Sequence, residues 1–420
     1  MDNPLCECDL KNMSFESDIL IIGGGLNGPI LALAAAQAGL TSTVIDALPL
    51  ERRAASGFDG RSYAMALTST RLLQGLGIWA ALSSDAQPML DIKVTDGRAG
   101  EGPSAFFMHF DHAEIEEGPM GFMVEDRHLR PVLLASMQAN PLITQLHGDP
   151  VKAQKTTAAG IEVTLNSGKT VHGRVLIGCD GRASGTALRA GLKRIGWDYG
   201  QTALVCAVNH EHPHHGIAHQ FFMPAGPLAI LPLTGNRSSI VWSEKSETAA
   251  RINDLPDTAY LDILRPRFGD FLGEISLAGA RFTYPLSLSL VHELIADRVA
   301  LVGDAAHGIH PIAGQGLNAG LRDIAALAEV FADATRRGED IGSALVLARY
   351  QQWRRFDNTA LALATDTFNR LFSNDHPILR ATRDLGMGIV GRIPALRRSF
   401  IREAAGLTGD LPRLLRGKSL

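Results

Sequence analysis

Between Asp18 and Asp46 the chain has no charged side chain, and a run of this length invites comparison with a transmembrane helix. Small and polar residues interrupt the run and divide it into a strand, a turn and a helix. They are Gly23, Gly24, Gly25, Asn27, Gly28, Pro29, Gln37, Gly39, Thr41, Ser42 and Thr43. The N-terminus also lacks the basic leader of a signal peptide. We therefore expect no signal peptide and no spanning helix, and a protein that is cytoplasmic or peripheral on the inner face of the membrane.

The same run carries a G-x-G-x-x-G signature in a strand–turn–helix–strand context. An apolar, β-branched strand precedes the glycines, an alanine-rich helix follows them, and a second strand ends at Asp46. Gly23 permits the turn, Gly25 lets the backbone approach a pyrophosphate, and Gly28 lets helix and strand pack. Asp46 stands where a carboxylate binds ribose hydroxyls. The pattern predicts a dinucleotide-binding fold, with the cofactor phosphates at a helix N-terminus.

A second G-x-G-x-x-G segment, Gly386 to Gly391, shows that the signature alone is weak. Arg383-Asp384-Leu385 precedes it in place of a strand, and Pro394 interrupts any helix soon after it. We interpret this second segment as a flexible bend.

Two further apolar strands end in glycine and aspartate, at Asp180-Gly181 and at Gly303-Asp304. A helix is predicted to begin near Gly316, where free backbone N–H groups would face negative charge. In open α/β sheets, ligands collect at the carboxyl ends of the strands. Three such ends, including the first signature, predict one large cofactor.

The composition is that of a soluble globular protein of two or three domains, with 45% hydrophobic residues and a net charge of −4 over 420 residues. Four cysteines without a C-x-x-C pair supply neither a disulfide framework nor a zinc site, which favours a reduced intracellular protein. A near-neutral charge offers no basic field for nucleic acid. A histidine cluster fits no zinc spacing, so no metal is predicted. It comprises His210, His212, His214, His215 and His219.

The charge is unevenly distributed along the chain. From Pro377 onward there are nine basic and three acidic residues, a net charge of +6, which leaves −10 for residues 1–376. In this tail Ile389, Ile393, Leu396 and Phe400 recur at helical spacing among arginines. A basic amphipathic helix of this kind either lies on an anionic membrane or packs on its own protein, and the sequence leaves both open.

With these motifs the chain resembles the FAD-dependent aromatic-ring hydroxylases of the para-hydroxybenzoate hydroxylase fold, and within them the ubiquinone-biosynthesis hydroxylases. The resemblance covers roughly residues 17–375. Besides the glycine–acid motifs, it rests on five segments. They are Asp59-Gly-Arg61-Ser-Tyr-Ala-Met-Ala-Leu67, Glu125-Asp-Arg127-His-Leu129, Trp197-Asp-Tyr199, Gly226-Pro-Leu-Ala-Ile-Leu-Pro-Leu233 and the residues from Gly303 to Asn318.

The resemblance implies an α/β fold, α+β overall, with a Rossmann-like FAD-binding domain, an interleaved β-sheet substrate domain and a C-terminal helical region. The implied boundaries are 15–80, 122–192 and 282–345 for the FAD-binding domain, 81–121 and 193–281 for the substrate domain, and 346–420 for the helical, basic tail.

The resemblance also assigns residues to the cofactor. Gly23, Gly25 and Gly28 take the FAD diphosphate, Asp46 takes the adenosine ribose, Arg61 and Arg127 lie against the cofactor, and Asp304 binds the ribityl chain. Backbone at Gly316, Leu317 and Asn318 faces the flavin pyrimidine, and Pro311 borders the substrate side of the ring. Asp180 belongs to a motif linked to both FAD and pyridine nucleotide. The family has an arginine where this chain has Ala187, with Arg189 two residues later, which puts the nicotinamide contact in doubt.

The implied activity is hydroxylation of the ring of a polyprenylated phenol in ubiquinone biosynthesis, most like that of the enzyme acting on polyprenyl-methoxyphenol, through a flavin hydroperoxide. FAD is the implied cofactor, NAD(P)H the electron donor and dioxygen the co-substrate. A ubiquinone-biosynthesis complex and the membrane surface are implied partners. No Ser-His-Asp, metal or Walker motif supports a hydrolase or phosphoryl transfer.

Two alternatives stay open on the sequence. One is a flavoenzyme of the same fold that reduces or epoxidises another isoprenoid lipid, and the other is a flavin-binding scaffold subunit without turnover. No catalytic base is identified, because nothing in the spacing of Tyr63, Tyr199 and Tyr284 shows which of them touches a phenol. We interpret His307, Phe221, Phe222 and Trp242 as structural residues.

Overall fold

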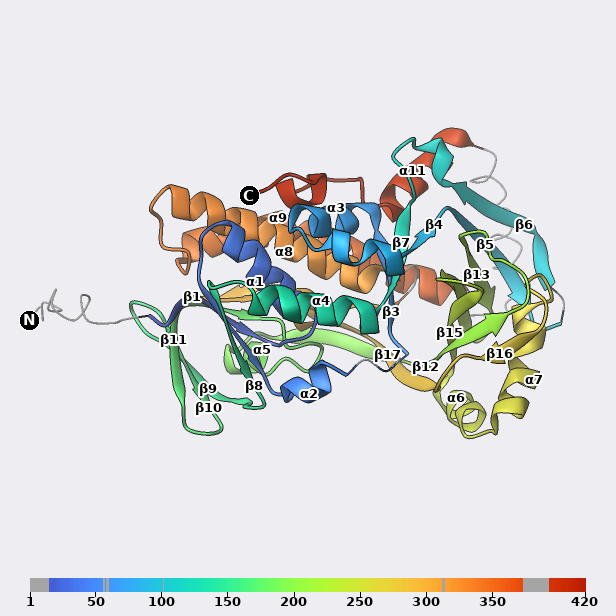
Figure 1. Cartoon of the computed structure of the whole chain (residues 1–420), viewed down its shortest axis with the longest axis horizontal. Coiled ribbons are helices and arrows are strands. Elements are labelled where there is room, and N and C mark those ends of the chain that lie inside the picture. Colours follow the sequence, from blue (N-terminus) through green and yellow to red (C-terminus); the bar gives the residue numbers. More distant parts are fainter. Residues whose placement is uncertain (1–14, 56, 58–59, 101, 312–313, 373–392) are drawn as a thin grey trace, which may run out of the picture.

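The computed structural model describes residues 15–372 and 393–420, apart from residues 56, 58–59, 101 and 312–313. Two large sheets form its two halves, and helices gather over one side of the first (Figure 1). The segment from 386 to 391 and Ile389 lie outside the described residues.

The first sheet has the strand order β18-β19-β11-β1-β2-β8. Pairing is parallel between β1 and both β2 and β11, between β11 and β19, and between β2 and β8. Strands β9 and β10 extend it as an antiparallel hairpin beside β11. The strands are β1 (Ser17–Ile22), β2 (Ser42–Asp46), β8 (Ile143–His147), β9 (Val151–Thr156), β10 (Ile161–Leu165), β11 (Thr170–Gly178), β18 (Ile295–Ala296) and β19 (Val299–Leu301).

Alternation along β1 explains how this sheet is buried on both faces. Ile19 and Ile21 point into a core shared with the helices, whereas Leu20 and Ile22 point into a second core beneath the β9–β10 hairpin. Helices α1 (Asn27–Gln37), α4 (Asp126–Gln138) and α8 (Gln315–Arg336) contribute to the first core. The uncharged run is thus strand, turn, helix and strand, as predicted.

The second sheet has the order β20-β17-β12-β15-β14-β13-β5-β6, with β16 beside β12. Leu204, Cys206 and Trp242 on one face pack against helices α6 (Ser246–Asn253) and α7 (Asp257–Phe268). The strands are β5 (Asp91–Arg98), β6 (Gly102–Asp111), β12 (Arg194–His210), β13 (Ile217–Met223), β14 (Gly226–Leu233), β15 (Arg237–Lys245), β16 (Ile275–Leu277), β17 (Phe282–Val291) and β20 (His307–Gly308). The long strands β12 and β17 run from one half of the molecule to the other (Figure 1).

A small sheet of β3 (Ser62–Ala66), β7 (Gly121–Glu125) and β4 (Gln87–Met89) lies between the halves. Its Met89 and Met123 pack against Ala207, Ala218 and Leu233 of the second sheet. Shorter helices connect these parts. They are α2 (Leu50–Arg53), α3 (Leu67–Gly75), α5 (Gly185–Arg189) and the 3₁₀ turns Trp79–Ala81, Ser83–Asp85, His112–Glu114 and Gly303–Ala305.

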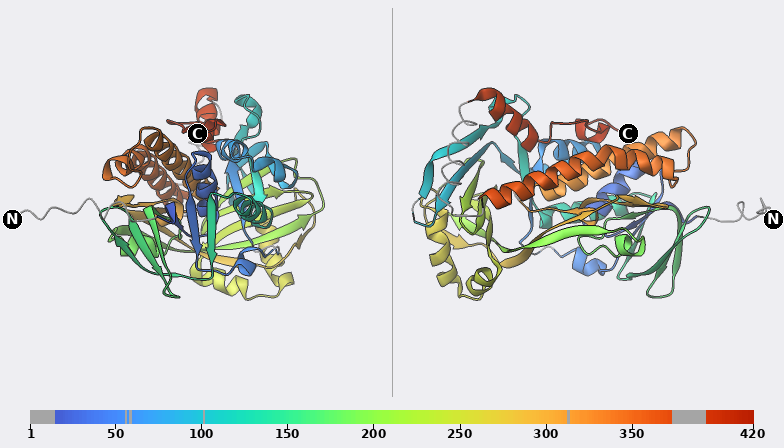
Figure 2. Two further views of the ribbon diagram at one scale, coloured as in Figure 1. Left: turned by 60° about the vertical axis from the view of Figure 1, so that its left-hand side comes forward. Right: turned by 180° about the vertical axis from the view of Figure 1, so that it is seen from behind.

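Helix α9 (Ala344–Phe372) lies beside α8 and runs along the back of the molecule (Figure 2). After it, α11 (Pro394–Ala404) contacts β6, and a 3₁₀ turn (Arg413–Arg416) contacts α3. The fold class predicted from the sequence is confirmed, whereas the domain boundaries stay a prediction. Among the described residues no helix is both long and apolar enough to cross a membrane.

Candidate active site

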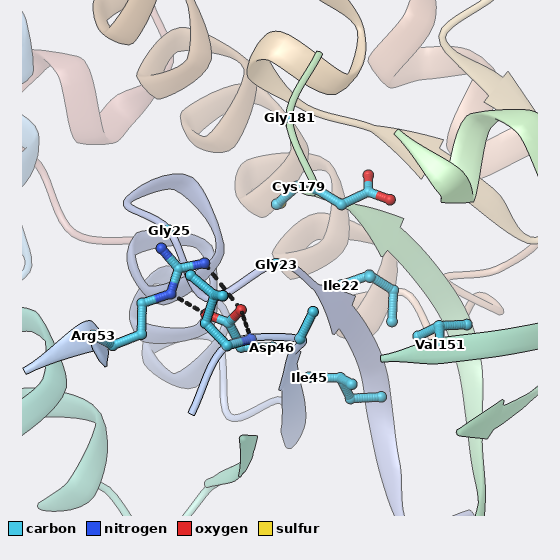
Figure 3. A pocket seen from close by; sticks show the side chains of 12 residues that line it. Ile22, Gly23, Gly25, Ile45, Asp46, Arg53, Val151, Cys179 and Gly181 are labelled. Carbon is cyan, nitrogen blue, oxygen red and sulfur yellow. Dashed lines mark hydrogen bonds and ion pairs between the residues drawn. The ribbon is translucent and has the colours of Figure 1, made fainter. Parts of the chain in front are cut away.

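Three of the predicted glycine–acid motifs come together at one edge of the first sheet. Strands β1, β11 and β19 are neighbours and run parallel, so the turns that follow them lie side by side. The turn after β1 is hydrogen-bonded to its neighbour, because Cys179 N donates to Ile22 O at 2.7 Å. Figure 3 shows Gly23, Gly25, Cys179 and Gly181 around the resulting cavity.

The three signature glycines have different surroundings. Gly23 has a φ of +111°, and a Cβ there would lie 2.4 Å from the carbonyl oxygen of Cys179. A Cβ on Gly28 would lie 2.0 Å from the carbonyl oxygen of Gly23. Among the residues that the structure describes, no atom lies within 4 Å of the would-be Cβ of Gly25. Two glycines are therefore required by packing, and the third faces open space, as the approach of a diphosphate to the backbone requires.

The cavity beside this turn has a volume of about 300 Å³, and Asp46 lies on its wall. Asp46 is 2% exposed at the end of β2, and its carboxylate accepts hydrogen bonds from Leu48 N at 3.0 Å and from both Nε and a terminal nitrogen of Arg53. A ribose at this carboxylate would share it with Arg53 (Figure 3). Sequence reasoning missed Arg53, which belongs to a basic pair in the segment that follows the acid-ended strand, seven residues after Asp46.

Asp180 and Asp304 lie at neighbouring strand ends but have different partners. Asp180 accepts hydrogen bonds from Ser184 Oγ, Thr186 N and Thr186 Oγ1 at 2.5–2.9 Å, so it orders the start of α5. Asp304 pairs with Arg182 at 3.3 Å, and the same arginine donates to Ile309 O at 3.2 Å. Arg182, which the sequence did not single out, thus connects the Asp180-Gly181 turn to the Gly303-Asp304 turn.

Arg189, the arginine that follows the Asp180 motif two residues later than in the family, makes a contact with β9. Arg189 is the last residue of α5, and its Nε donates to Gln154 Oε1 on β9 at 3.2 Å. Burial lowers the pKa of Arg189, and the nearby Asp180 opposes that shift. The proposed nicotinamide contact at this motif stays a prediction.

Helix α8 begins where the sequence predicted a helix start. Gly314 precedes it with a φ of +64°, and no atom of the described part of the chain lies within 4 Å of the would-be Cβ of Gly316, in the first turn. Asn318 fixes the helix start to β3, donating to Ala64 O at 2.8 Å and accepting from Ala66 N at 2.9 Å. In any α-helix the first-turn N–H groups point out of the helix end, and here they include that of Leu317, next to Gly316. Pro311 is partly exposed in the loop before α8.

The two predicted cofactor arginines are held by acids at the end of β7 and the start of α4. Arg61 lies 3.5 Å from Asp126, and Arg127 lies 3.1 Å from Glu125. Glu125 also pairs with Arg237 of β15 at 2.9 Å. Burial alone would raise the pKa of Glu125, but the hydrogen bonds and charges of Arg237 and Arg127 outweigh it and lower that pKa. The acids therefore orient the arginines and connect the small sheet to the second sheet.

Other residues weighed on the sequence have structural partners. His307 is buried and hydrogen-bonds to Asp323 at 2.5 Å, which confirms a structural histidine. Phe221, Phe222 and Trp242 are buried in core packing, as interpreted. Tyr63 donates to Asp126 at 2.8 Å, and burial raises its pKa. In the histidine cluster, His210 bonds to His212 O and Ser238, and His214 bonds to Leu233 O.

Asp323 was missed altogether by the sequence reasoning, yet it organises the Gly303-Asp304 turn. It is fully buried on α8, and it accepts hydrogen bonds from Gly303 N at 3.0 Å, Arg354 Nε at 2.9 Å and Asn358 Nδ2 at 3.2 Å. An acid among the apolar residues of a helix was its only sequence signal. The position of Asp304 therefore depends on a charge network that reaches into α9.

The geometry fits FAD: open backbone at Gly25 and Gly316, a carboxylate in a cavity, and a further acid at the adjacent strand end. A family model described as an FAD binding domain matches residues 16–361. The chain belongs to this FAD-binding family. Within it, the chain is a member of the ubiquinone-biosynthesis hydroxylases, because two relatives with such names are at least 33% identical to it over nearly their whole length.

Two such relatives and one solved structure illustrate the similarity. Ubiquinone hydroxylase UbiL of Rhodospirillum rubrum is 45% identical, with 96% of this chain and 94% of that protein covered. The 3-demethoxyubiquinol 3-hydroxylase of Escherichia coli is 33% identical, with 93% and 99% covered. The p-nitrophenol 4-monooxygenase PnpA of Pseudomonas putida has the same fold, with a TM-score of 0.77 at 20% identity over 94% of this chain and 99% of that one. This chain is therefore an FAD-dependent monooxygenase.

Proposed function

We propose that this monooxygenase hydroxylates the ring of a polyprenylated phenol in ubiquinone biosynthesis, with NAD(P)H as electron donor. The observation that carries the proposal is the 45% identity to a ubiquinone hydroxylase along nearly the whole of both chains. The pathway assignment comes from that relative, and the apolar face of the second sheet supports the substrate class.

The second sheet supports an apolar, uncharged substrate. Trp242 and Leu204 face α6 and α7, so the alternate residues face the FAD-binding half. Those residues include Ala203, Val205 and Val241, which form one apolar cluster with Leu286. Such a surface suits a phenol with a hydrocarbon tail better than a substrate that carries a carboxylate.

When bound, FAD supplies the activation of dioxygen, and the chain must hold the reactants and exclude water. Two contacts hold the small sheet to the second sheet: Ser62 Oγ donates to Ser239 Oγ at 2.8 Å, and Arg237 pairs with Glu125. Gly314, before α8, lies so close to β3 that a Cβ there would be 2.7 Å from Ala64 Cβ. These contacts support a flavin end, at the start of α8, that would be enclosed by β3, α8 and the second sheet.

Oxygen uptake tests this proposal. Purified protein loaded with FAD is expected to consume dioxygen with NADH or NADPH when a short-chain prenylated methoxyphenol is present, and to form a product heavier by one oxygen atom. A product with two added hydrogens would indicate a reductase, and an oxygen on the isoprenoid chain would indicate an epoxidase. Absence of substrate-dependent uptake and product would reject the proposed activity and favour the scaffold alternative.

The C-terminal helix supports a further proposal, a peripheral contact with an anionic membrane. On α11, Leu396 and Phe400 are 43% and 41% exposed, and Arg398 and Arg402 are exposed beside them. Part of the helix packs on its own protein, because Ile401 is buried against β5 and β6. We propose that the exposed residues approach the inner face of the membrane, where a biosynthetic complex would also assemble.

Vesicle sedimentation checks the membrane proposal. The holoprotein is expected to sediment with vesicles that contain anionic phospholipid and to stay in the supernatant with zwitterionic vesicles. Changing both Arg398 and Arg402 to Glu should reduce the bound fraction at least tenfold, because each basic residue near an anionic surface contributes about 1 kcal/mol. The same double change at Arg336 and Arg337, exposed at the end of α8, is the matched control. Equal binding by the two double variants would contradict the proposal.

A further inference from the structure

His310 is a buried titratable residue that the cofactor site does not use. It lies in the loop between β20 and α8, beside Pro311, and its side chain is 0% exposed. Neither Nδ1 nor Nε2 has a hydrogen-bond partner in the part of the chain that the structure describes. Leaving a buried polar atom without a partner costs about 1–3 kcal/mol, so an imidazole with two such atoms is costly unless a ligand completes it.

The surroundings of His310 keep its ring neutral. Burial is the main cause of the lowered pKa, and the charge of Arg182 adds to it, while Asp366 of α9 opposes both; the resulting pKa is about 4. The ring of Tyr199, on β12, packs edge-on with its centroid 5.2 Å from that of His310. A neutral imidazole offers one N–H donor and one acceptor nitrogen.

The position of His310 relates it to the reacting end of the cofactor. Asp304 lies in the 3₁₀ turn before β20, and α8 begins at Gln315, so His310 lies along the chain between the two elements that were assigned to the flavin. Tyr199 packs in two apolar clusters: one holds Ile309, and the other holds Val205 and Val241 of the flavin-facing side of the second sheet. His310 is therefore buried where the flavin end meets the apolar substrate surface.

We propose that His310 binds the phenolic hydroxyl of the substrate and is a catalytic residue of the hydroxylation; this inference rests on the proposed function. Its acceptor nitrogen takes a hydrogen bond from the hydroxyl, which orients the ring and leaves more electron density on it. Tyr199 forms the wall against which His310 is held.

This contact gives the phenolic proton a place to go during the reaction. As a ring carbon gives an electron pair to the incoming oxygen, the phenolic O–H becomes strongly acidic and its proton moves to His310. The ring carbon then loses its own proton, aromaticity returns, and the phenolic oxygen regains a proton from His310. One oxygen atom of dioxygen enters the C–O bond, and the other leaves as water with the two electrons from NAD(P)H.

A binding comparison without turnover tests the inference. Oxidised holoprotein is titrated with a short-chain prenylated methoxyphenol and with its methyl ether, which lacks the O–H, and the perturbed flavin absorbance gives each Kd. Wild type is expected to prefer the phenol by roughly tenfold to a hundredfold, the ratio that corresponds to one buried hydrogen-bonding partner. In His310→Ala the phenol and its methyl ether should bind with about equal Kd. His310→Gln keeps a donor and an acceptor and should retain part of the preference.

His219→Gln is the matched control. His219 is another histidine whose pKa burial lowers to about 4, but it packs against Phe221 and Phe271 on the far face of the second sheet. This variant should keep the wild-type preference. An unchanged preference in His310→Ala, or in His310→Leu if the alanine variant does not fold, would overturn the role of His310. Failure of wild type to bind either ligand would remove the proposed function and this inference with it.

Discussion

Replacing Asp323 by alanine is expected to lower the free energy of unfolding by about 3–5 kcal/mol, measured by urea denaturation of the purified protein. Asp323 has no exposed surface, and its carboxylate is the buried partner of Arg354, whose side chain is 4% exposed. Removing the acid leaves the buried guanidinium with Asp357 and Asn358, and it takes away the acceptor of Gly303 N and of His307. Losing the central acid of a buried charge network costs this much because the remaining members keep only part of their compensation.

Asp333→Ala is the matched control on the same helix. Asp333 pairs with Arg336 at 3.3 Å, but both side chains are partly exposed, and exposed pairs contribute about 0–1 kcal/mol. Both variants replace an aspartate of α8 by alanine, and they differ in how deeply the aspartate is buried. A loss below about 1 kcal/mol in Asp323→Ala, similar to the control, would contradict the view that this network holds α8 and α9 together.

The same network predicts a pH dependence. Burial would raise the pKa of Asp323, but His307 and Arg354 outweigh it and hold that pKa well below the ordinary value. A carboxyl whose pKa is lower in the folded state stabilises the fold above its unfolded pKa of about 3.9, and the contribution fades as the pH falls below that value. The stability difference between wild type and Asp323→Asn should therefore be constant near neutrality and shrink below about pH 4.

An effect on the cofactor should accompany the loss of stability. Asp323 accepts from Gly303 N, so its removal releases the turn that carries Asp304. Asp323→Asn keeps the size and one acceptor oxygen, and we expect it to bind FAD more weakly than wild type but better than Asp323→Ala. Fluorescence of released flavin measures both affinities.

The local elements of the cofactor site could be predicted from the sequence because their signals are short-range. The apolar run before Gly23, the glycine spacing and Asp46 specify a strand, turn, helix and strand within one continuous segment. The parallel-strand rule then placed Asp180 and Asp304 at the same sheet edge, without knowledge of the strand order. The structure has those strands as immediate neighbours.

The partners of these residues could not be predicted, since they come from distant parts of the chain. Arg182 reaches Asp304, and Arg354 reaches Asp323, through contacts that only the folded topology creates. His310 has no motif spacing of its own, and its importance appears only when its burial and its unpartnered nitrogens are known. Sequence patterns identify which strand ends form the site, but side-chain pairing across elements decides which charges remain available to a ligand.

The signature glycines allow the roles of packing and cofactor approach to be separated. Gly28→Ala is expected to destabilise the protein and to abolish FAD binding, because the new Cβ would lie 2.0 Å from the backbone oxygen of Gly23, which cannot move aside as a side chain would. Gly25→Ala is expected to leave the unfolding free energy of the FAD-free protein unchanged, since its Cβ would meet no atom of the described residues within 4 Å.

Gly25→Ala should nevertheless bind FAD roughly tenfold to a hundredfold more weakly, because a methyl group where the diphosphate approaches the backbone costs about 1–3 kcal/mol. Gly75→Ala, at the end of α3, is the control for the substitution itself, as its Cβ would make an ordinary contact at 3.5 Å with Leu414. Urea denaturation without FAD and titration with FAD measure the two effects separately. Equal stability losses in Gly25→Ala and Gly28→Ala, or wild-type FAD affinity in Gly25→Ala, would show that the open space at Gly25 is not where the diphosphate binds.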